Sequence, residues 1–226
     1  MSKFLSMTIE DFHIKITGNQ HGPWLVFLHG LLGSSLNWMK ITAAFEDQFH
    51  VLIFDQRGHG KSFKPTTGYS PDDFAGDIRF LMDNLQILKA TLIGHSMGGR
   101  NALRFANLYP QRIEKLVLED IGPEATLENG LGLLKKIKSV PVPFKDKRAA
   151  KEFLLNEFEN PQLGNHLYNH ITVLGDDSAV WDFSMGTIAE IIEKGRSSSQ
   201  WQDVENLKCP TLVIRGSQSE ELSVTK

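Results

Sequence analysis

The sequence predicts an α/β protein with a mostly parallel, doubly wound sheet and an inserted helical cap. Short, continuously apolar runs, typical of parallel strands buried on both faces, alternate with longer stretches whose apolar residues recur at helical spacing. That alternation indicates right-handed β-α-β crossovers with helices on both faces of one sheet. Roughly ninety residues separate the last two apolar runs, too many for a plain connection, and their helical patterns predict the cap.

Composition places the chain among ordinary globular proteins. It has 226 residues, of which 41% are hydrophobic and 23% charged, and a net charge of -3. This content is enough for one sizeable core, and it gives no sign of a nucleic-acid partner. Cys209 is the single cysteine, so no internal disulfide can form. No stretch has the pattern of a signal peptide or a membrane span, and we expect a cytoplasmic monomer or homodimer without a membrane span.

The predicted strands follow the order of a wound sheet. Two short alternating patterns between Phe4 and Thr17 suit an antiparallel pair at a sheet edge. The apolar runs that predict buried parallel strands are 24–28, 51–54, 91–93, 116–118 and 211–214.

Helical patterns connect these strands. Ser70 is a predicted N-cap, with Pro71 at the first helical position and acidic residues in the first turn. The other helical patterns cover about 37–45 and 98–109 in the core, and 127–137, 149–158, 163–171 and 188–192 in the cap. We expect residues 1–122 and 207–226 to form the core domain and 123–206 to form the cap.

The pentapeptide from Gly94 to Gly98 has the pattern G-x-S-x-G, with Ser96 at its centre. A short apolar strand precedes it and a helical pattern follows it, which predicts a sharp strand-to-helix turn. Such a turn holds the serine in a strained backbone conformation that lifts its hydroxyl clear of the sheet, and glycine on either side permits the close backbone approach.

Polar residues follow several of the predicted strands. His29, Asp55, Ser96 and Asp120 each come at the end of an apolar run. Because active sites in open α/β sheets lie outside the carboxyl ends of the strands, we expect these residues to share one edge of the sheet.

The chemistry of a serine nucleophile requires partners. A neutral hydroxyl needs a histidine to take its proton and an acid to orient that histidine. Two N–H groups should point at the carbonyl oxygen that gains charge. Met97 is expected to supply one of them, since it starts a helix where amides are unpaired and the helix dipole favours anions.

Three motifs in sequence order carry a family resemblance: His29-Gly30 after a strand, the glycine-punctuated loop 55–62, and the turn at Ser96. With them the chain resembles the α/β-hydrolases from its first strands to its last residue. The segment 118–123, Leu-Glu-Asp-Ile-Gly-Pro, closely resembles a bacterial esterase subgroup related to mammalian ABHD-type hydrolases. Members of that subgroup hydrolyse acyl esters and, in some cases, acyl thioesters.

The resemblance implies roles for further residues. Leu31 matches the position of the second oxyanion donor. In the resembled subgroup the acid follows the strand before the cap, which implies Asp120, with a serine matching Ser219 near the acid. In many other family members the acid follows the strand after the cap, which would make it Glu220. We favour Asp120, although it could instead cap a turn.

The histidines near these motifs have simpler explanations. We expect His29 to shape its loop rather than to take part in catalysis, and His95 to pack or bond locally beside the nucleophile; with Gly30 they are candidates for the substrate pocket. His166 and His170 stand four residues apart, a spacing that suits a metal, but no third ligand lies nearby in the sequence. We therefore expect no metal and no cofactor.

The family's catalytic histidine lies on a loop further along than this sequence extends, and no histidine follows His170. None of the eight histidines matches that base. We expect the functional protein to continue for a few tens of residues and to supply it. Without a base, turnover should fall by about a millionfold.

The leading functional expectation is a serine esterase acting on short to medium acyl esters through an acyl-enzyme on Ser96, with acyl thioesters as a second candidate substrate class. A carbon-carbon bond hydrolase of the same fold and a non-catalytic small-molecule-binding protein are the alternatives. Seven basic residues between Lys135 and Lys151 are expected to form a solvated helix face, but they could attract an anionic carrier such as coenzyme A.

Overall fold

The computed structural model describes residues 7–124, 127–158, 160–217 and 219. The chain divides into two compact units. The first comprises residues 1–125 and 194–226, and the second comprises residues 126–193.

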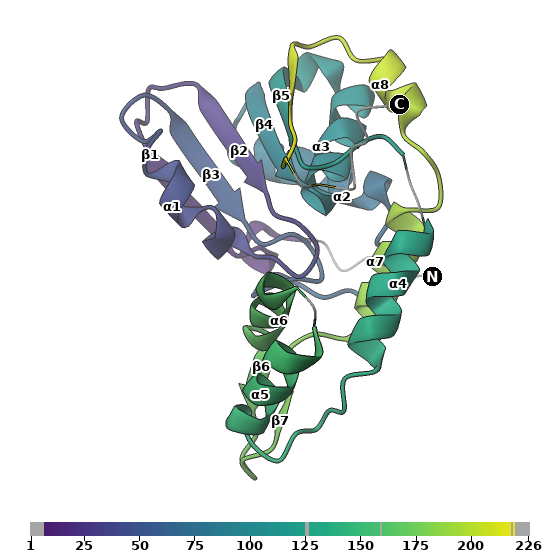
Figure 1. The fold of residues 1–226 in the computed structure, drawn as a ribbon. Helices are drawn as coiled ribbons and strands as arrows, with labels where there is room; N and C mark the ends of the chain where they lie inside the picture. The colour runs from purple at the N-terminus through teal and green to yellow at the C-terminus, as the bar shows by residue number, and fades with distance from the viewer. Residues whose placement is uncertain (1–6, 125–126, 159, 218, 220–226) are drawn as a thin grey trace, which may run out of the picture. The chain divides into compact units, whose positions relative to one another are not determined.

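The first unit contains a six-stranded sheet in the order β1-β3-β2-β4-β5-β8 (Figure 1). All neighbouring strands are parallel except β1, which pairs antiparallel with β3. The mostly parallel sheet predicted from the sequence is therefore confirmed. The strands are β1 (Ile14–Gly18), β2 (Trp24–Leu28), β3 (His50–Phe54), β4 (Ala90–His95), β5 (Ile113–Glu119) and β8 (Thr211–Ile214).

The central strands bury both faces, as their continuous apolar pattern predicts. On β2, Val26 and Leu28 belong to one core cluster, whereas Leu25 and Phe27 belong to a second cluster with Trp38. Side chains alternate between the two faces of a strand, so one apolar run supplies two cores.

The larger core cluster also contains the apolar faces of α2 (Pro71–Asn84) and α3 (Met97–Leu108). Ser70 caps α2 as predicted: its Oγ accepts from Asp73 N–H at 3.3 Å, and Asp73 Oδ2 accepts from Ser70 N–H at 2.9 Å. Short helices complete this unit: η1 (Ile9–Asp11), η2 (Ser35–Asn37), α1 (Met39–Thr42), η3 (Pro110–Arg112) and α8 (Trp201–Glu205).

The second unit is largely helical. Its helices are α4 (Leu127–Lys138), α5 (Lys147–Glu157), α6 (Pro161–Tyr168) and α7 (Met185–Gly195), the last of which ends just inside the first unit. Strands β6 (Ile171–Val173) and β7 (Ala179–Trp181) form an antiparallel pair.

Several predicted elements differ in detail. The helical pattern over 163–171 ends at Tyr168, and Ile171 already begins β6, because a short apolar run suits a strand and a helix equally. No strand pair forms within residues 7–17: β1 pairs with β3 instead, since alternation shows that a strand has one buried face but not which strand is its partner. The 37–45 pattern gives only η2, α1 and turns.

The second unit is shorter at both ends than the cap of residues 123–206 expected from the sequence. Arg100 on α3 shows how the flanking segments are held. Its buried guanidinium donates to the carbonyl oxygens of Glu124 (3.2 Å), Gly195 (2.9 Å) and Ser198 (2.9 Å). One α3 side chain thereby fixes both segments that lead into and out of the second unit.

Candidate active site

Ser96 lies between β4 and α3 in the strained conformation that the pentapeptide predicts. Its backbone angles are φ 49° and ψ -115°, and its N–H donates to the Glu119 carbonyl at 3.0 Å. A Cβ added to Gly94 would overlap the backbone of Gly98, and one added to Gly98 would overlap the Leu28 carbonyl. The tight turn from strand to helix therefore requires both glycines.

The loop after β2 lies against this turn. A Cβ on Gly30 would stand 2.7 Å from His95 Nδ1 and 3.4 Å from the Ser96 Cβ, so Gly30 brings the two segments into contact. Leu31 is half-buried next to it, and the buried Leu32 has a positive φ of 57°. The geometry brings the predicted loop of the second oxyanion donor beside the serine.

Asp120 lies at the end of β5, the neighbour of β4. Residues His95 and Glu119 are paired in register, so Ser96 and Asp120 each follow a paired position. The Asp120 N–H donates to the Ile214 carbonyl at 2.7 Å, and Asp120 Oδ1 accepts from the Gly216 N–H at 3.2 Å.

The turn after β8 also brings Ser219 to this corner. Its N–H donates to the Gly216 carbonyl at 3.0 Å, and a Cβ placed on Gly216 would lie 3.5 Å from Asp120 Oδ1 and 3.7 Å from the Ser219 Cβ. Glu220, the alternative acid, lies outside the described residues.

Backbone strain gathers at these strand ends. Within the described part of the chain, five residues other than glycine have a positive φ. Leu32, Ser96 and Asp120 are three of them, in the turns after β2, β4 and β5. Sparsely populated backbone conformations cost about 1 to 3 kcal/mol each and concentrate at functional sites, which makes this edge of the sheet the candidate active site.

His29 is buried inside the loop rather than directed at the serine's chemistry. Its Nε2 accepts from the Gln56 N–H at 2.9 Å, and its Nδ1 bonds the Gly30 carbonyl at 2.8 Å. A ring whose two nitrogens are both used in this way holds a loop in shape. Two partners in this network, Gln56 and the buried Asn101 on α3, were not identified from the sequence, because a lone glutamine or asparagine has no distinguishing pattern.

Asp55 organises the loop that follows β3. Its Oδ1 accepts from the Ser35 N–H at 2.7 Å and its Oδ2 from the Lys61 N–H at 2.9 Å. Burial alone would raise the pKa of Asp55, but these hydrogen bonds to its charged form outweigh burial and lower the pKa. Gly60 has a φ of 49° and no room for a Cβ beside the carboxylate. Asp55 is thus an ionised structural group.

The remaining histidines of interest lie in other surroundings. His59 is buried, with Nδ1 3.0 Å from the Arg57 carbonyl and its ring edge-on to His29. In the second unit His166 and His170 pack edge to face, and His170 Nδ1 lies 2.9 Å from Asp182 Oδ1. Among the described residues, no three potential metal ligands come together, around this histidine pair or elsewhere.

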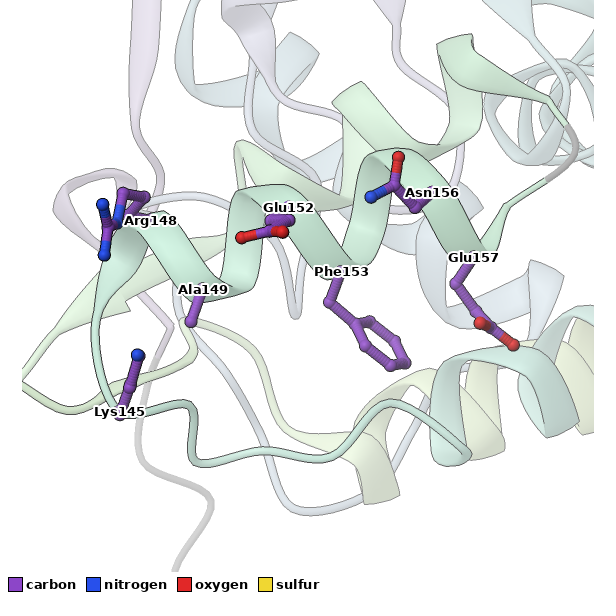
Figure 2. A pocket seen from close by; sticks show the side chains of 7 residues that line it. All are labelled: Lys145, Arg148, Ala149, Glu152, Phe153, Asn156 and Glu157. Carbon is purple, nitrogen blue, oxygen red and sulfur yellow. The ribbon is translucent and has the colours of Figure 1, made fainter.

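A pocket of about 390 Å³ lies along α5 in the second unit (Figure 2). Phe153 points from the helix into it, and two cationic and two anionic side chains line it: Lys145, Arg148, Glu152 and Glu157. Two other members of the basic cluster are placed differently, since the Nζ atoms of Lys147 and Lys151 lie 5.6 and 5.7 Å from the Tyr168 ring centroid. Four of the seven basic residues are therefore divided between a pocket of balanced charge and an aromatic contact, and the other three, Lys135, Lys136 and Lys138, lie in the last turn of α4.

A wound parallel sheet with a strained serine turn at its carboxyl edge defines a class of hydrolases, and comparison with known families agrees. The profile described as "alpha/beta hydrolase fold" matches residues 23–152, and the chain belongs to that family.

Among curated proteins, 2-(acetamidomethylene)succinate hydrolase of Mesorhizobium japonicum is 28% identical over 97% of this chain and 80% of its own length. The mouse sn-1-specific diacylglycerol lipase ABHD11 is 28% identical over 90% of this chain and 68% of its own length. A solved marine microorganism esterase superposes with a TM-score of 0.81 at 25% identity, covering 95% of this chain and 84% of that one. These relatives support a hydrolase related to the ABHD type.

Within the described part of the chain, no helix is both long and apolar enough to cross a membrane.

Proposed function

We propose that the protein is a serine esterase that hydrolyses short to medium acyl esters, and acyl thioesters, through an acyl-enzyme on Ser96. The observation that carries this proposal is the strained Ser96 turn between β4 and α3, packed against the loop after β2. A backbone held at φ 49° is costly, and presenting a serine nucleophile at the carboxyl edge of the sheet is the chemical reason to keep it.

In the proposed reaction, Ser96 Oγ bonds to the ester carbonyl carbon as a general base takes the hydroxyl proton. The N–H groups of Leu31 and Met97 stabilise the resulting oxyanion. The carbon-oxygen bond to the alcohol then breaks, and the alcohol leaves with that proton. Water next attacks the acyl-enzyme, which releases the carboxylic acid and restores the serine.

Asp120 is the proposed acid of this machinery. Its carboxylate lies at the end of the strand next to the serine's strand and accepts from the turn that carries Ser219. An ionised carboxylate there can orient an imidazole and stabilise the charge that the imidazole gains.

A second candidate function is hydrolysis of a bond other than that of a simple ester, such as a carbon-carbon bond. The relative from M. japonicum that matches nearly the whole chain is named for a substituted succinate, which supports this alternative. A non-catalytic binding protein is the remaining alternative, and the strained serine turn argues against it.

The test is the hydrolysis of p-nitrophenyl acetate, butyrate and octanoate by the protein and by its Ser96→Ala variant. With a general base in place, we expect turnover by the parent and a loss of about a millionfold in the Ser96→Ala variant. Ser197→Ala, at an exposed serine whose hydroxyl donates to the Lys194 carbonyl, is the matched control and should keep full turnover. Equal ester turnover with and without Ser96 would contradict the proposal.

A further inference from the structure

The side-chain amide of Gln56 is buried and links the loop after β2 to α3. Gln56 is 1% exposed. Its side-chain Nε2 donates to the His29 carbonyl at 2.6 Å, and its Oε1 accepts from Asn101 Nδ2 at 2.9 Å. Together with its backbone N–H, which donates to His29 Nε2, Gln56 contacts both His29 and Asn101 through three hydrogen bonds.

At the His29 end of this link, the hydrogen bonds fix the direction of the Leu31 N–H, one of the two proposed oxyanion donors. Because His29 Nε2 accepts from Gln56, the ring proton is on Nδ1, which donates to the Gly30 carbonyl. The Gly33 N–H donates to the same carbonyl at 2.9 Å. That carbonyl belongs to the planar, trans peptide unit that carries the Leu31 N–H, so fixing the carbonyl fixes the opposite direction of the N–H.

The second end is attached to the helix of the other donor. Asn101 is 2% exposed and lies one turn after Met97, the first residue of α3. Gln56 therefore joins the peptide unit of Leu31 to the helix that begins at Met97. The backbones of these two segments already touch, since a Cβ on Gly98 would stand 2.6 Å from the His29 carbonyl oxygen.

We propose that Gln56 is a positioning residue that holds the two oxyanion donors, Leu31 N–H and Met97 N–H, at the separation the transition state requires. This inference rests on the proposed function. A positioned donor acts on the charge that develops during reaction, so its displacement lowers kcat and leaves ground-state binding nearly unchanged.

The test combines kinetics with hydrogen exchange on three variants. Gln56→Met keeps the side-chain length and removes the amide. Asn101→Ala removes only the attachment to α3. Asn107→Ala is the control, because this asparagine is on the same helix but bonds Asp203 (2.6 Å) instead of the loop.

For Gln56→Met we expect kcat for p-nitrophenyl butyrate to fall about 10- to 100-fold with KM changed less than about twofold. Amide exchange should accelerate in peptides covering 29–34 and stay unchanged in β1 and β3. Asn101→Ala should show the same pattern to a smaller extent. The double variant should have nearly the same kcat as Gln56→Met, because both substitutions break the same link between the loop and α3. Asn107→Ala should behave as the parent.

An unchanged kcat in Gln56→Met would overturn the positioning role, and so would a rise in KM by the same factor as the fall in kcat. Either result would leave the esterase proposal intact. If Gln56→Met does not fold, Asn101→Ala decides by the same criteria. If the parent shows no ester turnover with a general base in place, the proposed function is overturned and this inference with it, whatever the hydrogen exchange shows.

Discussion

Asp120 and Glu220 are the two residues proposed for the acid that orients the catalytic base. In Asp120→Asn we expect ester turnover to fall by about ten-thousandfold, because an amide cannot stabilise the imidazolium and favours the wrong tautomer. Glu220→Gln should keep most of the activity. Turnover of p-nitrophenyl butyrate by the two variants checks the assignment, and near-full activity of Asp120→Asn together with loss in Glu220→Gln would reverse it.

Asp55 gives a pH-dependent prediction about stability. Its hydrogen bonds lower its pKa in the folded protein below the value of about 3.9 in an unfolded chain. The stability it contributes is therefore fully present above that value and is lost as the pH falls through the lower folded pKa. Asp55→Asn should destabilise the protein by about 1 to 3 kcal/mol at pH 7, because an amide cannot accept both N–H groups equally well.

Urea unfolding between pH 3 and pH 7 checks this prediction. The difference in unfolding free energy between the parent and Asp55→Asn should shrink below about pH 4. Asp47→Asn removes an exposed carboxylate and should show no such change. A difference that grows as the pH falls would contradict the assignment of an ionised Asp55.

At the scale of single elements, the start of α2 depends on its cap. Ser70→Ala removes the acceptor for the Asp73 N–H and should cost about 1 kcal/mol of unfolding free energy. Ser197→Ala, also a serine near a helix end but exposed, should change stability by less than about 0.5 kcal/mol. Equal effects in chemical denaturation would show that the capping box contributes nothing specific.

Elements were predictable from the sequence where one physical signal was sufficient. Ser70, Pro71 and two acids define the start of α2, and the glycines around Ser96 define its turn. β6 was not predicted because it continues the apolar pattern of the helix before it, and β7 was not predicted because its three residues are too few to show a period. Gln56 and Asn101 were also missed, because their partners come from other segments and only the fold brings them together.

At the scale of the whole molecule, substitutions in the basic cluster test whether the second unit contributes to substrate specificity. The pocket on α5 balances Lys145 and Arg148 with Glu152 and Glu157, so we expect no strong attraction for a polyanionic carrier. The double variant Lys145→Gln/Arg148→Gln should leave KM for butyryl-coenzyme A within about twofold of the parent at low salt. A rise of tenfold or more that disappears at high salt would show that these side chains bind the carrier.

The central claim is that Ser96 is a nucleophile held by a strained turn. The most direct measurement is labelling of the protein with a fluorophosphonate probe, followed by peptide mass mapping. We predict one labelled serine, Ser96, and no labelling of Ser96→Ala under the same conditions. A parent protein that stays unlabelled while remaining folded, or a label on another serine that persists in Ser96→Ala, would contradict this account.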